Sequence, residues 1–360
     1  MRAYAYGVPI VGSALALVLA TNAPLAAGDR SLAELVEAYR TGDRELAVAA
    51  VTLLSRERVE AEVERLVAIL SRAGLSGRAL RQAAAALLTE SGVINLEAAA
   101  LPRGRFELET AARLVQAGPA ATRGGAFERR FYLVAGIALQ AAGELAPAYD
   151  MLEQGLRVAG DDPELLTATG AVVETVAALR QYEPSPDADA RRSRPGGYAT
   201  ESGGSGSLED ARLARAEALY EKALTLDPRL AEARLRRARV RVLRGRQDAA
   251  LPDLERVALE GRDAGQRYLA RLFEGRARDA LDDARGAAAA YRAAAELVSA
   301  QSAFLALGRA LDRLGDRGAA QEALEAASAA AGPDDPWWDY QSGQPARLDD
   351  LLVELRGLVE

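Results

Sequence analysis

The side chains available for chemistry are restricted, because the 360 residues include no histidine and no cysteine. Histidine is the commonest general base, histidine and cysteine are the usual zinc ligands, and a thiolate is the nucleophile of cysteine enzymes. The remaining candidates are carboxylates, hydroxyls, tyrosines and arginines. A pair of carboxylates could act on a glycan of the cell envelope, but the acidic residues follow no recognisable catalytic motif. We predict no catalytic residue, no metal and no cofactor.

The charge balance argues against nucleic acid as a partner. The chain has 45 Lys and Arg residues against 52 Asp and Glu residues, a formal net charge of −7. A nucleic-acid-binding domain normally carries a basic face. We therefore expect a protein or peptide partner and no nucleic acid.

Residues 1–28 have the layout of a secretory signal peptide. A basic start precedes an apolar stretch from Val8 to Ala20, and small residues follow. This order is typical of a signal that is cleaved, here after Ala27 or Gly28. The apolar stretch is shorter than the roughly 20 residues that span a bilayer, so we expect an exported bacterial protein, periplasmic or secreted, without stable membrane insertion. Two alternatives remain, a buried first helix and an uncleaved anchor that would make the chain a membrane-anchored assembly factor.

Beyond the signal, the sequence predicts one helix after another. Apolar residues recur with the helical period, and 49% hydrophobic with only 5% aromatic residues suits closely packed helices. Ser31 and Glu34 form a capping box that starts the first helix. Residues 29–125 are predicted to form helical hairpins whose repeat register the pattern does not fix. Breaks between these helices are expected at Thr41–Gly42, Ala73–Gly74, Ser91–Gly92, Pro102–Gly104 and Ala117–Pro119.

Two later segments share one spacing of small residues. Gly136 and Ala148 are twelve residues apart, as are Gly308 and Ala320. This pattern resembles the tetratricopeptide repeat (TPR), a two-helix unit of about 34 residues. The resemblance implies an all-α fold, a right-handed solenoid of helical hairpins. The first small residue of each pair would lie where the two helices of a repeat approach most closely.

The TPR-like register covers residues 126–182 and 208–333. The equivalent small residues are Gly136, Gly170, Ala238, Gly275 and Gly308. The first two are 34 residues apart and the last two 33, close to one repeat. In the repeat of Ala238, positions that are usually apolar hold Arg234, Arg237 and Arg241. Either the stems of these arginines pass beside a neighbouring helix, or this repeat packs loosely.

Residues 183–207 interrupt one repeat, between the helix that contains Gly170 and its expected partner helix. The segment is rich in Pro, Gly and Ser and nearly lacks apolar residues, so we expect a disordered insertion. One interpretation is a tolerated loop, since lengthening a loop costs little. The other is a flexible arm that binds a partner through Arg191, Arg192 and Arg194.

In TPR proteins the first helices of successive repeats line a concave groove, and the resemblance implies that the ninth repeat position faces it. That position holds Ile137, Ala171, Arg239, Arg276 and Arg309. We identify Arg239, Arg276 and Arg309 as candidate peptide-binding residues, because a ladder of guanidinium groups suits the carboxylates of an acidic peptide. Alternatively, the last two pair with Asp279 and Asp312, three residues further along their helices.

Residues 334–360 are predicted to form a turn with two tryptophans and then a C-terminal capping helix. A solenoid exposes the apolar face of its last repeat, so we expect this amphipathic helix to cover Leu324. Trp337 and Trp338 either pack beneath the helix or bind a partner as exposed aromatic side chains.

These features favour a non-catalytic scaffold or adaptor outside the cytoplasm, which binds a protein or peptide in a TPR-like groove. The alternative is a carboxylate-dependent enzyme of the cell envelope, which would require two carboxylates that converge with raised pKa values. The sequence does not indicate an oligomeric state.

Overall fold

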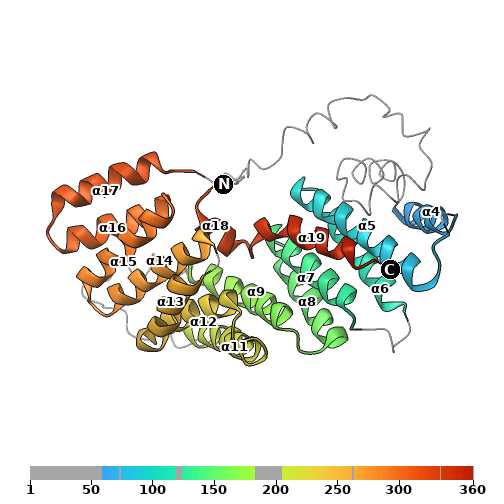
Figure 1. Cartoon of the computed structure of the whole chain (residues 1–360), viewed down its shortest axis with the longest axis horizontal. Coiled ribbons are helices and arrows are strands. Elements are labelled where there is room, and N and C mark those ends of the chain that lie inside the picture. Colours follow the sequence, from blue (N-terminus) through green and yellow to red (C-terminus); the bar gives the residue numbers. More distant parts are fainter. Residues whose placement is uncertain are drawn as a thin grey trace. The chain divides into compact units, whose positions relative to one another are not determined.

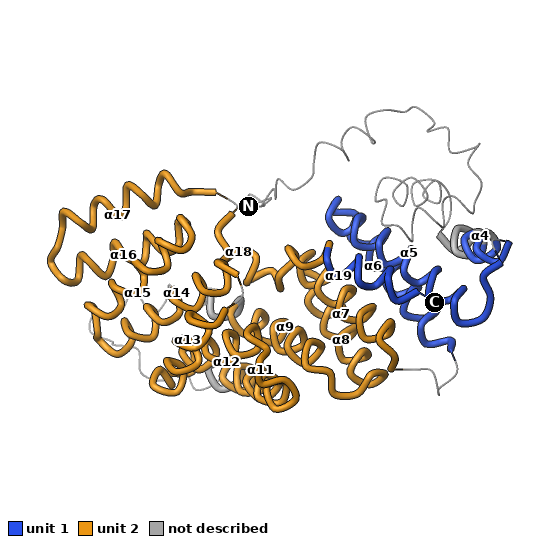
Figure 2. Tube along the Cα trace, viewed as in Figure 1, with its two compact units in different colours: residues 1–120, 350–360 blue, residues 121–349 orange. Residues whose placement is uncertain are grey.

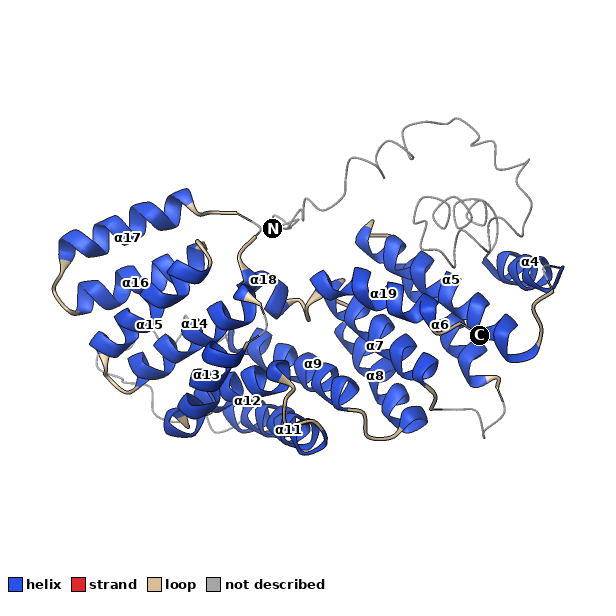
Figure 3. Ribbon diagram, viewed as in Figure 1, coloured by secondary structure: helices blue, strands red, loops and turns tan. Residues whose placement is uncertain are grey.

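The structure is a computed structural model that describes residues 59–72, 74–118, 124–182, 205–261, 263–332 and 334–359. Within these ranges the regular elements are helices and no strand is present (Figure 3), which confirms the all-α prediction. The expected signal peptide lies outside the described residues. None of the helices in the described ranges is both long and apolar enough to cross a membrane.

The helices follow one another with mostly short connections (Figure 1). They are α4 (Val59–Arg72), α5 (Gly77–Glu97), α6 (Leu101–Gln116), α7 (Ala126–Ala141), α8 (Leu145–Ala159), α9 (Pro163–Tyr182), α11 (Ser205–Leu226), α12 (Ala231–Leu243), α13 (Gln247–Glu260), α14 (Ala264–Ala280), α15 (Ala284–Leu297), α16 (Gln301–Arg313), α17 (Arg317–Ala329), α18 (Pro336–Gln341) and α19 (Leu348–Gly357). A short 3₁₀ turn, η3, spans Pro345–Arg347. The chain divides into two compact units, residues 1–120 with 350–360 and residues 121–349 (Figure 2).

In the first unit, α5 and α6 form a hairpin that is tightest at two glycines. A Cβ atom on Gly92 would lie 2.8 Å from Leu108, and one on Gly104 would lie 2.7 Å from the carbonyl oxygen of Gly92. The break expected at Ser91–Gly92 is wrong, because Gly92 lies inside α5. The break expected at Pro102–Gly104 is found at residues 98–100, so Gly104 lies inside α6. Gly92 and Gly104 have the same twelve-residue separation as the TPR pairs.

The C-terminal helix α19 exists as predicted and buries Leu351 and Leu355. Its Arg356 forms an ion pair of 2.5 Å with Glu90 of α5. The expectation that this helix covers Leu324 is wrong, since the Leu324 side chain is 49% exposed. The amphipathic pattern specified that α19 is buried on one side, but not which helix it meets.

The second unit is built from TPR-like hairpins, in which α7 pairs with α8, α12 with α13, α14 with α15 and α16 with α17. A Cβ atom on Gly136 would lie 2.4 Å from Leu152, and one on Gly275 would lie 2.3 Å from Tyr291. These contacts place the predicted small residues where two helices approach most closely. The predicted TPR-like solenoid of helical hairpins is therefore confirmed.

Helices α9 and α11 also form one hairpin, although they are separated by an insertion. A Cβ atom on Gly170 would lie 2.5 Å from the ring of Tyr220, so Tyr220 occupies the place that Leu152 and Tyr291 take in their hairpins. Helix α11 already begins at Ser205, so the last residues of the predicted 183–207 insertion are helical. Residues 183–204 lie outside the described part.

Candidate peptide-binding face

One face of the second unit is formed by the first helices of its hairpins, α7, α9, α12, α14 and α16. Residues 334–347, which comprise α18 and η3 and which we call the tail segment, lie along this first-helix face. Helix α18 contacts α14 and η3 contacts α7 (Figure 1). The face is therefore occupied by a stretch of the same chain.

Asp335 anchors the start of the tail segment. Its Oδ1 atom accepts a hydrogen bond of 3.0 Å from the Tyr268 hydroxyl, and its Oδ2 atom accepts one of 2.9 Å from the backbone N–H of Ser302. Oδ1 also caps α18 by accepting from the N–H of Trp337. Burial, and then the charge of Asp335, raise the pKa of Tyr268, so its hydroxyl keeps its proton and donates. One buried carboxylate thus joins the tail segment to α14 and α16.

Trp337 is the aromatic centre of the contact. The guanidinium carbon of Arg276 lies 4.4 Å from the centre of the Trp337 ring, and that of Arg239 lies 4.9 Å away. The ring of Phe273 meets the Trp337 ring edge-on at 5.8 Å between centres. A cation above an aromatic face is attracted by the negative charge of the ring face, so both arginines stabilise the bound tryptophan.

Tyr340 reaches a buried carboxylate on α9. Its hydroxyl donates a 2.9 Å hydrogen bond to Glu174, which is 1% exposed, and the Tyr220 hydroxyl donates another of 2.7 Å. Glu174 also forms ion pairs with Arg239 and, at 3.5 Å, with Arg236. Burial, and then the charge of Glu174, raise the pKa values of both tyrosines well above the ordinary value. Both phenols are therefore neutral donors.

Arg236 holds the other side of Tyr340. Its guanidinium carbon lies 4.1 Å from the centre of the Tyr340 ring, and one of its N–H groups donates a 3.1 Å hydrogen bond to the Tyr340 carbonyl. Glu232 accepts a further hydrogen bond from Arg236. The buried cluster of two glutamates and two arginines is therefore balanced in charge around one tyrosine of the tail segment.

The far end of the tail segment passes over α7 and α9. Gly343 has a φ of +83°, and a Cβ atom there would lie 2.5 Å from the side chain of Gln140. Arg347 donates a 3.0 Å hydrogen bond to Glu164. The tail segment thus contacts each first helix of the second unit, from α16 back to α7.

Comparison with known proteins supports the repeat assignment. No protein-family model matches the sequence, and no curated protein matches it. A solved tetratricopeptide repeat protein from Parabacteroides merdae ATCC 43184 is similar over 91% of this chain and 98% of its own, with a TM-score of 0.51 and 13% identity. The chain has a TPR fold. MamA from Desulfovibrio magneticus RS-1 also matches, with 22% identity over 57% of this chain and 96% of its own and a TM-score of 0.41.

The three arginines predicted to bind a peptide lie in different surroundings. Arg276 stacks on the tail segment and Arg309 is exposed on α16. Arg239 is buried against Glu174, although a residue that binds a peptide in an open groove was expected at this position. Asp279, the alternative partner of Arg276, accepts hydrogen bonds from Tyr291 and Arg313.

Sequence reasoning missed Glu174, although the TPR pattern contains a signal for it. Glu174 follows Gly170 by four residues, as Gln140 follows Gly136. Both side chains face the tail segment. The fourth position after the small residue therefore belongs to the first-helix face in these two repeats.

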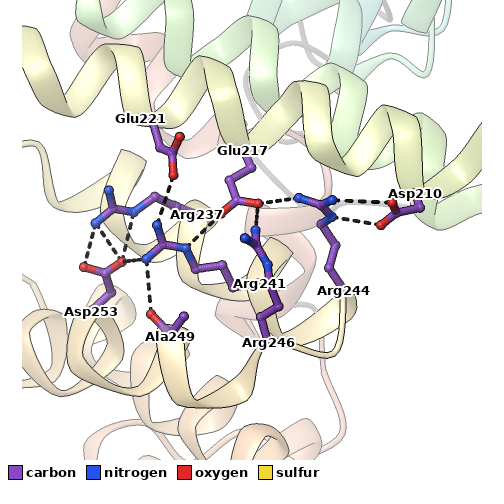
Figure 4. Close-up of polar contacts among 9 residues, drawn as sticks. All are labelled: Asp210, Glu217, Glu221, Arg237, Arg241, Arg244, Arg246, Ala249 and Asp253. Carbon is purple, nitrogen blue, oxygen red and sulfur yellow. Dashed lines mark hydrogen bonds and ion pairs between the residues drawn. The ribbon is translucent and has the colours of Figure 1, made fainter.

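Two further arginines of α12, Arg237 and Arg241, and Arg244 directly after it bind acidic residues of the neighbouring helices, as Figure 4 shows. Arg237 donates two hydrogen bonds, of 2.9 and 2.8 Å, to Asp253 of α13. Arg241 donates a hydrogen bond of 3.1 Å to Asp253 and another of 2.9 Å to Glu217 of α11. Arg244 donates a 2.7 Å hydrogen bond to the same Glu217. This repeat is therefore held by paired charges at positions that are usually apolar, and loose packing does not describe it.

Exchange of Asp339 for asparagine is expected to raise the melting temperature at neutral pH. Burial raises the pKa of Asp339, and a hydrogen bond from the N–H of Ala346 opposes this rise. Glu232 adds to the rise, while Arg236 and Arg347 oppose it. Because the folded-state pKa exceeds the unfolded value of about 3.9, stability falls as pH rises between the two. Asparagine removes the charge and keeps an oxygen that accepts from the Ala346 N–H.

Thermal unfolding followed by circular dichroism tests this expectation. The difference between the two proteins should be largest at pH 7 and should shrink as the pH falls through the raised folded-state pKa of Asp339 and below its unfolded value of about 3.9. A variant that melts below the parent at pH 7 would show that the charge of Asp339 stabilises the tail segment instead.

Proposed function

We propose that the protein is a non-catalytic scaffold that binds a protein or peptide through the first-helix face. The observation that carries this proposal is the tail segment, a short stretch of polypeptide that this face already holds through Asp335, Trp337 and Tyr340. A surface with such contacts has the groups needed to hold a peptide of another chain. The TPR fold of the chain fits this role, and the signal-like residues 1–28 support an extracytoplasmic location.

The arrangement favours an acidic peptide with aromatic residues. Arg276 offers a guanidinium group for stacking and Arg309 is exposed on the next first helix. Arg239 is buried and paired with Glu174, and its guanidinium group lies against the Trp337 ring. Charge-assisted hydrogen bonds from arginine suit carboxylates, and a guanidinium group also stacks on aromatic rings.

A selection of displayed random peptides against the full chain tests the proposal. We expect the selected peptides to be enriched in Trp, Tyr, Asp and Glu, and to bind less tightly at high salt, because salt screens exposed charges. The double variant Arg276→Glu and Arg309→Glu should weaken their binding at least about tenfold, since a loss of about 1.4 kcal/mol is tenfold in affinity.

The matched control is Arg285→Glu with Arg292→Glu. Both residues are exposed on the second helix α15, so the control makes the same change in net charge away from the first-helix face. It should leave peptide binding nearly unchanged. Equal losses in both double variants would mean that the proposed face is not the binding site.

A further inference from the structure

The tail segment is held in the manner of a bound peptide. Three of its side chains, Asp335, Trp337 and Tyr340, are buried on the first-helix face. Trp338, between the last two of them, is 43% exposed, and Asp334, directly before the first, is also exposed. A few buried anchors with exposed residues between them are typical of a short peptide that binds to a preformed surface.

The surface beneath the tail segment is charged, whereas a permanent core is usually apolar. Arg236 and Glu174 are nearly inaccessible and both contact Tyr340, and Arg239 and Arg276 lie against Trp337. Removing charges from water costs free energy that their mutual attraction only partly offsets. If the tail segment leaves, these groups regain hydration, so the open face is compatible with water.

The tail segment also has the chemistry that the face would select in a partner. It contains the sequence Asp334-Asp-Pro-Trp-Trp-Asp-Tyr340, in which acids flank aromatic residues. Trp337 and Tyr340 stack on Arg276 and Arg236 of the face. Asp335 accepts hydrogen bonds from Tyr268 and from the backbone N–H of Ser302. A partner that binds the same groups must present a similar acidic and aromatic stretch.

We propose that the tail segment is an internal ligand that closes the first-helix face until a partner segment, with acids beside aromatic residues, displaces it. This inference rests on the proposed function and adds its regulation. Because the tail segment belongs to the same chain, its effective concentration at the face is about millimolar. The apparent affinity for the partner is therefore lower than the intrinsic affinity, by the fraction of molecules whose face is open.

The test uses the full chain and a fluorescent peptide that copies residues 333–344. The double variant Trp337→Ala and Tyr340→Ala removes two anchors of the internal ligand. It should bind the peptide at least about tenfold more tightly than the parent, because the open fraction rises. The variant Trp338→Ala, which changes the exposed neighbour, should bind like the parent. A peptide with alanine in place of Trp337 and Tyr340 should not bind either protein.

A second measurement covers the case in which the double variant loses its helical circular dichroism. Hydrogen exchange is then measured on the parent with an excess of the unlabelled peptide. If the peptide displaces the tail segment, the backbone N–H groups of residues 334–347 should exchange faster. This includes the N–H of Ala346, which donates a hydrogen bond to Asp339. Unchanged exchange at saturating peptide overturns the proposal.

The remaining outcomes separate the inference from the function on which it rests. If the parent and the double variant bind the peptide with equal affinity, the face binds peptides, but the proposal that the tail segment is an internal ligand is overturned. A dimer in light scattering that exchanges its tail segments between copies would also overturn it. If neither the copied peptide nor any selected peptide binds either protein, the proposed function fails, and the inference fails with it.

Discussion

Replacing Glu174 with alanine should lower the free energy of unfolding by about 3–5 kcal/mol, the usual cost of leaving buried charges without their partner. Glu174 is the shared acceptor for Tyr220, Tyr340 and two arginines in the second unit. Without it, the guanidinium groups of Arg236 and Arg239 lose a counter-charge in a buried site. Urea unfolding, followed by helical circular dichroism, measures the loss.

Glu221→Ala is the matched control. Glu221 is 51% exposed and forms a 3.1 Å ion pair with Arg241, and exposed pairs contribute about 0–1 kcal/mol. The urea concentration at which half of the Glu221→Ala variant is unfolded should therefore stay close to that of the parent. If the Glu174 variant unfolds at the same urea concentration as the Glu221 variant, the buried cluster does not stabilise the unit.

Alanine at Gly275 should destabilise the fold, whereas alanine at Gly308 should not. The new methyl group at position 275 would lie 2.3 Å from the ring of Tyr291, which is buried and hydrogen-bonded to Asp279. Overpacking of this kind costs about 1–3 kcal/mol. At position 308 the nearest atom lies at 3.2 Å and belongs to Leu324, whose half-exposed side chain can rotate away.

The two variants should shift the melting temperature in opposite directions, because only Gly275→Ala creates a clash that outweighs the gain in helix propensity. Alanine is more favourable than glycine in a helix by about 1 kcal/mol. Gly308→Ala should gain part of this free energy, whereas in Gly275→Ala the cost of the clash exceeds it. Thermal unfolding of both variants beside the parent measures the difference. Equal shifts would mean that the α14–α15 hairpin can open at Tyr291 without cost.

The repeat register was predictable because it follows a local rule. Two helices that approach closely admit only small side chains, and Gly136, Gly170 and Gly275 show the contact directly. The same rule was overlooked at Gly92 and Gly104, because glycine is also a common signal for the end of a helix. Their twelve-residue separation distinguishes a close approach from a break.

The candidate site was predictable only in part. Repeat position nine holds Arg239 and Arg276, which both lie against Trp337 of the tail segment, and their role in binding a partner stays a prediction. The occupant of that face could not be predicted, because the hydrogen bond between Tyr340 and Glu174 joins residues 166 apart. Amphipathic periodicity likewise predicted that α19 is buried on one side, without indicating Glu90 as its contact.

The separation of Tyr340 from Glu174 has a consequence for biosynthesis. Each hairpin can fold soon after its second helix leaves the ribosome, because most of its contacts are local, and folding proceeds from the N-terminal side during translation. The contact between Glu174 and Tyr340 can form only after Tyr340, 166 positions further along the chain, has been translated. A nascent or prematurely terminated chain that lacks Tyr340 therefore presents an open charged surface, and the face can close only after Tyr340 has been translated.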